Sequence, residues 1–128
     1  MRLLLDTHSY LWFVAGSALL SNKARAVMLQ PGNTIFLSMA SALEIALKHS
    51  LGKLPLTVPL QVLIRDEPVA QGFSILDINA DHLLAMAAMP FHHRDPFDRV
   101  IIAQGLVENL PIISCDQIFD AYQVRRIW

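Results

Sequence analysis

The chain has little of what builds disulfides or zinc sites. Its 128 residues include one cysteine, Cys115, so no internal disulfide can form and a reducing compartment is favoured. No set of Cys and His residues stands at the spacing of a zinc site. No internal repeat or low-complexity segment is present either. These absences argue against a disulfide-stapled secreted domain, a structural zinc protein and a repeat protein.

The sequence also lacks a hydrophobic run long enough to cross a membrane. The uncharged stretch 7–22 contains three serines, one glycine and one asparagine, which makes it too short and too polar to span a bilayer. Asp6 and His8 interrupt the apolar start of the chain, where a signal sequence would be uniformly apolar. We therefore expect a cytoplasmic protein without membrane contact.

Charge is nearly balanced, whereas apolar residues are in excess. There are 10 Lys and Arg against 11 Asp and Glu, a formal net charge of −1, which at first argues against a nucleic-acid partner. Hydrophobic residues make up 54% of the chain and about 58% with its 5 glycines, against about 45–50% in typical domains. A small domain cannot hide so much apolar surface inside. Part of it is predicted to face a partner or a second copy of the chain.

Short apolar runs alternate with helical patterns along a length that suits one domain, 1–128. Strands are predicted at 2–6, 34–38, 73–78, 111–116 and 123–128, and helices at 9–16, 21–30, 41–52, 60–66, 79–89 and 96–110. Leu83, Leu84, Met86 and Met89 are expected to form a buried stripe on the helix 79–89. The alternation predicts an α/β domain with a mostly parallel sheet of about five strands, flanked by helices.

Four acidic residues fall at one edge of the predicted sheet. Asp6 ends the first strand and Asp116 ends the fourth. Asp98 and Glu44 lie in the early turns of helices, which begin at that same edge because helices return antiparallel to the strands. Ligands of such sheets bind beyond the carboxyl ends of the strands. The four carboxylates are therefore expected to converge on one rim.

Each of these acids also has a purely structural interpretation. Asp95 precedes Pro96 and suits the N-cap of a helix with proline at its first position. Asp98, three residues later, would complete an arrangement like a capping box. Glu44 alone could be a solvated helix residue, and Asp6 alone a turn. Taken together these interpretations weaken, because all four acids would have to reach one edge without a function.

The repulsion among four such acids indicates how they are held together. Two like charges 4 Å apart repel by about 4 kcal/mol at an effective dielectric constant near 20, whereas a whole domain is stable by only about 5–15 kcal/mol. Either some of the acids are protonated or a divalent cation lies among them. The four candidate ligands are all carboxylate oxygen donors, which favours Mg²⁺ or Mn²⁺ over Zn²⁺.

Four segments resemble a known family: LLLDTH, SALEIALK with the LGKL that follows, HHRDPFDRVIIAQ, and IISCDQIFDAYQV. They are similar to PIN-domain ribonucleases, specifically the VapC-type toxins of bacterial toxin–antitoxin pairs, in order from about Leu3 to Trp128. The combination DPFDR and IAQ is the most specific. The resemblance implies a three-layer PIN-like nuclease domain with an acidic pocket that binds Mg²⁺, for which Mn²⁺ can substitute.

The resemblance also assigns residues. By motif, the metal-binding and catalytic acids are Asp6, Glu44, Asp98 and Asp116. In DPFDRVIIAQ the family's metal-site acid is the one directly before RVIIAQ, which is Asp98, so Asp95 is left to cap the helix. Ser114 stands where the family often has threonine and keeps a hydroxyl group. The side chains expected to support the acids from close by are Asp95, Ser114 and Thr7.

The implied activity is Mg²⁺-dependent hydrolysis of RNA phosphodiester bonds by a toxin that is held inactive by a small antitoxin protein. The family also forms homodimers, which fits the excess of apolar residues. With four of the 11 acids in the pocket, 7 acids face 10 basic residues on the rest of the chain, so a phosphate partner becomes reasonable. The candidates for contact with RNA are Arg99, Arg94 and Lys48.

Two other functions compete with this hypothesis. A catalytically silent PIN-like interaction module would share the fold but not cleave RNA. A phosphoacceptor receiver domain has a similar length and an acidic pocket, but it needs an aspartate that ends the middle strand and a lysine that ends the last one. Here Asp77 is followed by Ile78 inside the strand, and the last strand, VRRIW, has no lysine.

Overall fold

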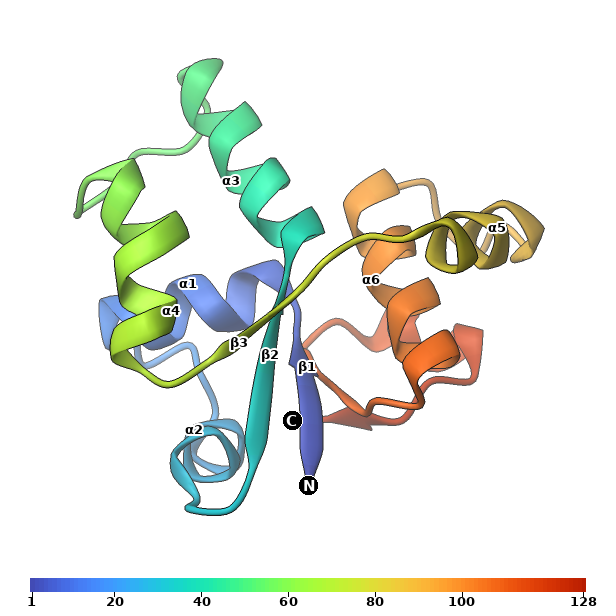
Figure 1. Cartoon of the computed structure of the whole chain (residues 1–128), viewed down its shortest axis with the longest axis horizontal. Helices are drawn as coiled ribbons and strands as arrows, with labels where there is room; N and C mark the ends of the chain where they lie inside the picture. The colour runs from blue at the N-terminus through green and yellow to red at the C-terminus, as the bar shows by residue number, and fades with distance from the viewer.

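Five short parallel strands form the centre of the protein, whose computed structural model describes all residues, 1–128. They lie in the order β3-β2-β1-β4-β5 (Figure 1). Their bounds are Arg2–Leu5 for β1, Thr34–Ser38 for β2, Ser74–Leu76 for β3, Ile112–Ile113 for β4 and Arg126–Ile127 for β5. The predicted parallel sheet of about five strands is confirmed.

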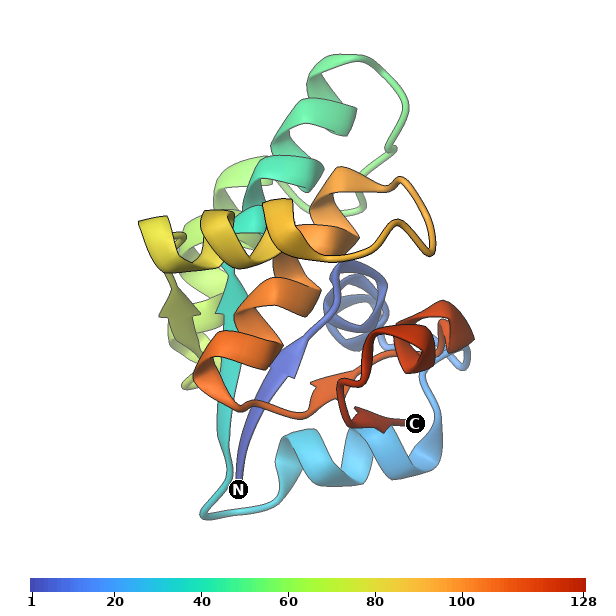
Figure 2. The ribbon, with the colours of Figure 1, turned by 90° about the vertical axis from the view of Figure 1, so that its right-hand side faces the viewer.

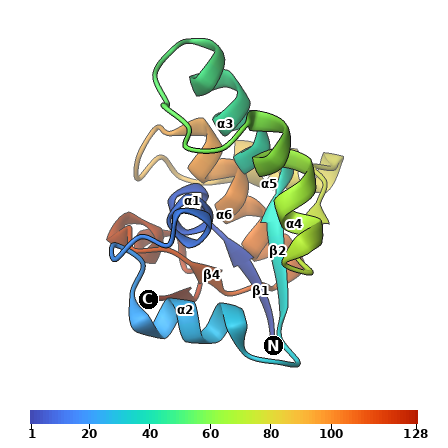
Figure 3. The ribbon, with the colours of Figure 1, turned by 90° about the vertical axis from the view of Figure 1, so that its left-hand side faces the viewer.

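Helices cover both faces of this sheet, which gives three layers. One face carries α1 (Thr7–Ala15), α2 (Asn22–Leu29), a π-helical turn η1 (Val62–Asp66) and α4 (Glu67–Ala70) (Figure 3). The other carries α5 (Ala80–Ala88), α6 (Pro96–Glu108) and a 3₁₀ helix η2 (Gln117–Tyr122) (Figure 2). Helix α3 (Met39–Ser50) extends beyond the carboxyl end of β2 (Figure 1). No helix is both long and apolar enough to cross a membrane.

The hydrophobic core is divided by the sheet because side chains alternate along each strand. In β1, Leu3 and Leu5 pack into the core shared with α1 and α2, whereas Leu4 packs into the core shared with α6. All three leucines are fully buried. A strand that is apolar on both faces is what a central parallel strand requires. The run LLL therefore specifies a strand in the middle of the sheet, where β1 lies.

Polar side chains define where the helices begin and how they dock. The N-caps of α2, α5 and α6 accept hydrogen bonds from the first turns of these helices, and they are Ser21, Asn79 and the predicted cap Asp95. Gln104 of α6 is fully buried. Its carbonyl oxygen accepts a hydrogen bond from the Ser38 hydroxyl at the end of β2, and its amide group donates to the carbonyl oxygen of Asp77. These bonds join α6 to the carboxyl ends of β2 and β3.

The strand order also indicates where a ligand-binding crevice is expected. The connection from β1 runs to its neighbour β2, whereas the connection from β4 runs the other way, to its neighbour β5, so the sheet reverses its order between β1 and β4. In doubly wound sheets ligands bind at such a reversal, outside the carboxyl ends of the strands. Receiver domains have the order 2-1-3-4-5, which differs from the order found here. The topology therefore excludes the receiver-domain alternative.

Several apolar side chains are exposed rather than buried. The prediction of a buried stripe on α5 is wrong for Leu83 and Leu84, which are 47% and 69% exposed. Only the other end of that stripe, at Met89, is buried. A second exposed group lies on α3 at a spacing of four residues and consists of Met39, Leu43, Leu47 and Leu51, the α3 leucine row. The sequence periodicity identified both helices correctly, but it does not say which apolar face meets the sheet.

Gly105 of α6 provides a test of how closely this helix packs on the sheet. A Cβ atom there would lie 2.8 Å from Ile112 Cδ1 and 3.2 Å from the carbonyl oxygen of Leu110. Ile112 is fully buried in the core between α6 and the sheet. Alanine in place of glycine inside a helix normally stabilises a protein by about 1 kcal/mol. Here we expect Gly105→Ala to lower the unfolding free energy by about 1–3 kcal/mol through overpacking, as measured by urea denaturation. A higher denaturation midpoint would contradict this packing.

Candidate functional site: an acidic cavity

A cavity of about 590 Å³ opens at the carboxyl ends of β1 and β4. Its wall is built from four separate parts of the chain: the start of α1, the middle of α3, the start of α6 and the segment after β4. All four acids selected from the sequence line it. The lining residues are Asp6, His8, Trp12, Glu44, Lys48, Asp95, Asp98, Cys115, Asp116 and Gln117.

Asp6 lies deepest, at the junction of β1 and α1. Its side chain caps α1 by accepting a hydrogen bond of 2.7 Å from the Ser9 backbone N–H, and the residue is only 4% exposed. Burial raises the pKa of this carboxyl group, and hydrogen bonds from Ser114 and Ser9 oppose the rise. Ser114 in turn accepts a hydrogen bond from the Asp116 N–H. Its hydroxyl group thus connects the first acid to the last.

Glu44 projects from α3 with only 4% of the residue exposed. One of its carboxylate oxygens pairs with the Lys48 ammonium group one turn later. This hydrogen bond raises the pKa of Lys48, so the lysine stays charged at the edge of the cavity. A charged partner of this kind lowers the free-energy cost of burying a carboxylate.

Asp98 lies in the first turn of α6, whose N-cap is Asp95. Burial raises the pKa of Asp98 to about 6, and the negative charge of Asp95 adds to that rise. The only hydrogen bond that reaches its carboxylate comes from His93, whose Nε2 is 3.2 Å from Oδ2. Asp95 also lines the cavity, while its own Oδ1 accepts from the Phe97 and Asp98 N–H groups.

Asp116 is exposed and caps η2, where its Oδ1 accepts a hydrogen bond from the Ile118 N–H. The preceding residue, Cys115, is exposed and lines the cavity. Strand β4 ends at Ile113, three residues earlier than predicted, so Cys115 lies outside the strand. Burial and the charges of Asp6 and Asp116 raise the pKa of its thiol, which disfavours the thiolate that would bind a soft metal.

The four acids are distributed around the wall, each with its own partner. No three His, Cys, Asp or Glu side chains are gathered as they would be around a bound ion. Each carboxylate has one oxygen in a separate hydrogen bond, with Ser9, Lys48, His93 or Ile118. The donor set still fits a hard cation, because its members are oxygen atoms and the one thiol is held protonated. Mg²⁺ keeps several water ligands and needs only one or two carboxylates in direct contact.

The remaining predicted residues have different positions. Thr7 is buried, and its hydroxyl group donates to Ser41 of α3 rather than facing the cavity. Arg94 is exposed just before α6. Arg99 is only 3% exposed, so its prediction as an RNA contact is wrong. Its guanidinium group faces inward, where it donates to the carbonyl oxygens of Met86, Met89 and Pro90 and to the Tyr122 hydroxyl.

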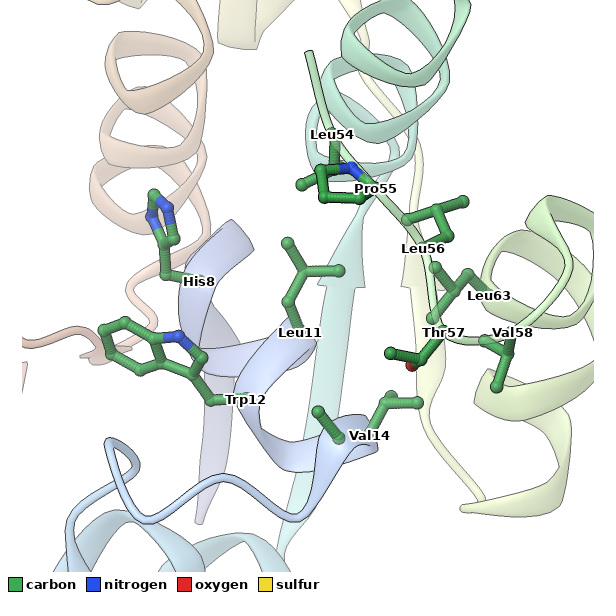
Figure 4. A pocket seen from close by; sticks show the side chains of 11 residues that line it. His8, Leu11, Trp12, Val14, Leu54, Pro55, Leu56, Thr57, Val58 and Leu63 are labelled. Carbon is green, nitrogen blue, oxygen red and sulfur yellow. The ribbon is translucent and has the colours of Figure 1, made fainter. Parts of the chain in front are cut away.

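An apolar pocket of about 240 Å³ adjoins the acidic cavity. Figure 4 shows side chains of α1 on one side and the segment 54–58 with Leu63 on the other. His8 and Trp12 line both spaces, with their ring centroids 5.5 Å apart. The sequence assigned no site role to these two residues. Their spacing of four, directly after Asp6, is the signal that places them on the same side of α1 as the acid.

Comparison with known proteins identifies the family. The model of the PIN domain matches residues 3–124 of the chain. The chain belongs to the PIN domain family. The resemblance found in the four sequence segments is thus confirmed at the level of the family. A comparison with curated protein sequences finds no match.

Solved structures with the same PIN fold come from toxin–antitoxin complexes. A chain of VapBC2 from Rickettsia felis, crystallised with a DNA fragment from its promoter, superimposes with a TM-score of 0.73 at 15% identity, covering 99% of this chain and 98% of that one. VapBC-1 from nontypeable Haemophilus influenzae gives 0.64 at 15% identity, with 99% and 97% covered. VapBC-5 from Mycobacterium tuberculosis gives 0.59 at 17% identity, with 98% of each chain covered. At such identities the likeness establishes the fold.

The raised pKa of Asp98 predicts how a neutral substitute changes stability. Its folded-state pKa of about 6 exceeds the ordinary value of 3.8, so stability from the protonated carboxyl is complete below about pH 4 and is lost as the pH rises through about 6. In metal-free protein, Asp98→Asn should therefore raise the unfolding free energy above pH 7 by about 1 kcal/mol, after allowance for solvent screening.

The control for this experiment is Asp116→Asn, which changes an exposed carboxylate of the same cavity. Urea denaturation of both variants and the wild type between pH 4 and pH 8 supplies the measurement. The advantage of Asp98→Asn should shrink toward zero at the acid end of the range. An advantage that is equally large at pH 4, or that is matched by Asp116→Asn, would contradict the assigned pKa shift.

Proposed function

We propose that this protein is the toxin of a toxin–antitoxin pair and hydrolyses RNA phosphodiester bonds with a divalent cation held in the acidic cavity. One observation carries the proposal: four carboxylates from four separate segments line one cavity at the point where the sheet of a PIN domain reverses its order. Mg²⁺ is the proposed cation, with Mn²⁺ as a substitute. Residues 1–128 are proposed to act as a single nuclease domain in the cytoplasm.

In this mechanism the side chains of the protein hold the cation and orient the attacking water, and none of them attacks the phosphorus. Asp6, Asp98 and Asp116 would hold the cation, directly or through water, with the carboxylate oxygens that their protein partners leave free. Glu44 would orient the attacking water, with one of its carboxylate oxygens held by Lys48. A bound Mg²⁺ supplies a lowered pKa for its water and neutralises charge on the phosphate.

Contact with the RNA backbone is proposed for the two cations that remain accessible. The Lys48 side chain is 41% exposed at the cavity edge, and Arg94 is exposed just before α6. Both can reach phosphate oxygens that approach the acids, and such contacts position the strand without reading its bases. The buried Arg99 has no part in this binding. Its guanidinium group is saturated by protein acceptors.

The proposed activity is tested by substituting the two aspartates of DPFDR one at a time. Asp98→Asn removes a proposed cation ligand and should lower RNA cleavage by more than about 100-fold, the upper end of what losing an outer partner of a metal site costs. Asp95→Asn should keep substantial activity, since asparagine also caps helices well. Cleavage of a panel of RNAs is measured in Mg²⁺ and in Mn²⁺, with protein freed of any inhibitor.

Two results would overturn these assignments. Equal loss of cleavage in both variants would contradict the division of roles between Asp95 and Asp98. An RNA panel left intact by the wild type in both metals would favour the alternative of a silent PIN-like interaction module. Growth after induced expression provides a parallel measurement, in which Asp98→Asn should be harmless and Asp95→Asn toxic.

An antitoxin is the proposed partner of the surface around the acidic cavity. The apolar pocket of Figure 4 shares His8 and Trp12 with that cavity, so one bound segment can cover both. A partner segment with an apolar side chain in the pocket would extend across the carboxylates and block them. The structures of similar fold support this proposal, since they are described as VapBC complexes.

A homodimer is proposed to form through the α3 leucine row. Its four side chains are between 37% and 58% exposed, which is unusual for four large apolar residues at regular spacing on one helix. Leu43→Lys should weaken self-association at least about tenfold, or about 1.4 kcal/mol, because it places an unpaired charge in the contact. Sedimentation equilibrium measures the dissociation constant.

Leu19→Lys is the matched control, since Leu19 is an isolated leucine with 66% exposure in the connection between α1 and α2. It should leave self-association unchanged. If the wild type were strictly monomeric at high concentration, the proposed dimer would be ruled out. An equal effect of the two lysine substitutions would show that the α3 leucine row is not the contact.

A further inference from the structure

The hydroxyl group of Tyr122 lies at the junction of several hydrogen bonds behind the acidic cavity. Tyr122 ends η2 and is only 5% exposed. Its oxygen accepts from the backbone N–H groups of His92 and His93, each at 3.1 Å, and from Arg99 Nη1 at 3.2 Å. It also lies 2.8 Å from Nδ1 of the His93 ring. Tyr122 itself is not among the residues that line the cavity.

Counting donors and acceptors determines which way the last of these bonds runs. A phenol oxygen accepts through its lone pairs and has a single proton to donate. Backbone N–H and guanidinium groups can only donate, so three donors already point at this oxygen. The Tyr122 proton has two acceptors within reach, Nδ1 of His93 at 2.8 Å and the carbonyl oxygen of His93 at 3.4 Å. The shorter contact takes the proton, so Nδ1 is an acceptor.

With Nδ1 acting as an acceptor, Nε2 is the ring nitrogen of His93 that carries a proton. That nitrogen is 3.2 Å from Oδ2 of Asp98 and donates to it. A proton on Nδ1 would make a fourth donor aimed at the Tyr122 oxygen, and would leave the phenol only the more distant carbonyl oxygen. The order of donation is therefore Tyr122 to His93 to Asp98. The donation from Tyr122 thus determines which nitrogen of His93 is free to donate to Asp98.

The far end of the series is anchored by Arg99. Its guanidinium group donates to three main-chain carbonyl oxygens as well as to Tyr122, and it lies 3.9 Å from the centre of the Phe91 ring. These contacts hold the segment between α5 and α6 in place. Because Arg99 is always charged, it cannot reverse its role as a donor. The Tyr122 proton is thereby directed away from Arg99 and toward His93.

We propose that Tyr122 is a positioning residue for the acidic site: its hydroxyl group fixes His93 as the Nε2–H tautomer, and His93 then orients the Asp98 carboxylate toward the cavity. This rests on the proposed function, in which Asp98 holds the cation. Asp95 fixes only the backbone of Asp98. His93 is the sole hydrogen-bond partner of the Asp98 side chain, so the direction of the carboxylate depends on which tautomer the His93 ring adopts.

The tautomer is measured directly by ¹⁵N NMR of the histidine rings in metal-free protein near pH 8. His93 is assigned by the signal that disappears in His93→Gln. In the wild type we expect one tautomer, with the proton on Nε2. Tyr122→Phe keeps the buried ring and removes only the proton donor, and it should produce a mixture of tautomers. A wild-type proton on Nδ1, or an unchanged tautomer in Tyr122→Phe, would overturn the proposal.

Tyr10→Phe is the matched control, because Tyr10 is another buried tyrosine whose hydroxyl group donates to a main-chain carbonyl oxygen, that of Leu63. It should lower stability without changing the His93 tautomer. The consequence for the site is measured as Mn²⁺ affinity by electron paramagnetic resonance. Tyr122→Phe should weaken Mn²⁺ binding by about 10–100-fold, the usual effect of losing an outer partner. A tautomer change with wild-type Mn²⁺ affinity would refute the positioning role.

Substitutions of His93 itself separate positioning from packing. His93 is partly exposed beside Asp98, so its replacement disturbs the fold less than that of a core residue. Gln at this position retains an N–H donor, whereas Leu has none. His93→Gln should therefore bind Mn²⁺ more tightly than His93→Leu, and equal losses would contradict an orienting hydrogen bond. If the wild type bound no Mn²⁺ and cleaved no RNA, the proposed function would fail, while the NMR result would still decide the tautomer.

Discussion

The concentration of negative charge at one edge of a parallel sheet is the constraint on which the rest of this structure depends. Parallel strands deliver their carboxyl ends, and the N-termini of the returning helices, to the same edge. Acids placed after β1 and β4, in the middle of α3 and early in α6 therefore share one cavity. Their repulsion is contained by giving each carboxylate a separate partner from the protein.

The segment DPFDRVIIAQG shows how many separate requirements one helix can meet. Asp95 caps α6 and Asp98 lines the cavity, while Arg99 holds the preceding segment from inside the protein. Gln104 joins the helix to the ends of two strands, and Gly105 lets it approach Ile112. Polar residues that look like surface residues in the sequence are buried here. Their hydrogen bonds fix the height of α6 above the sheet, and with it the position of Asp98.

Local patterns predicted the elements well, because strands and caps are specified by neighbouring residues. The run TIFLS became β2 with the bounds expected, and Ser21, Asn79 and Asp95 cap the predicted helices. Prediction failed where the answer depends on what packs against a residue. Arg99 reads as a surface cation until Tyr122 and the carbonyl oxygens around it are known. The leucines of α3 fit a helix, but only the fold shows that they remain uncovered.

The exposure of the only cysteine gives the site a built-in reporter. Cys115 lies on the wall of the acidic cavity, and no second thiol competes for a labelling reagent. Since its pKa is raised, alkylation is slow at neutral pH and accelerates in alkaline solution. The modification rate then becomes a measure of occupancy: whatever enters the cavity shields the sulfur. A fluorophore or spin label attached to Cys115 would report the binding of a molecule in the cavity without any engineered substitution.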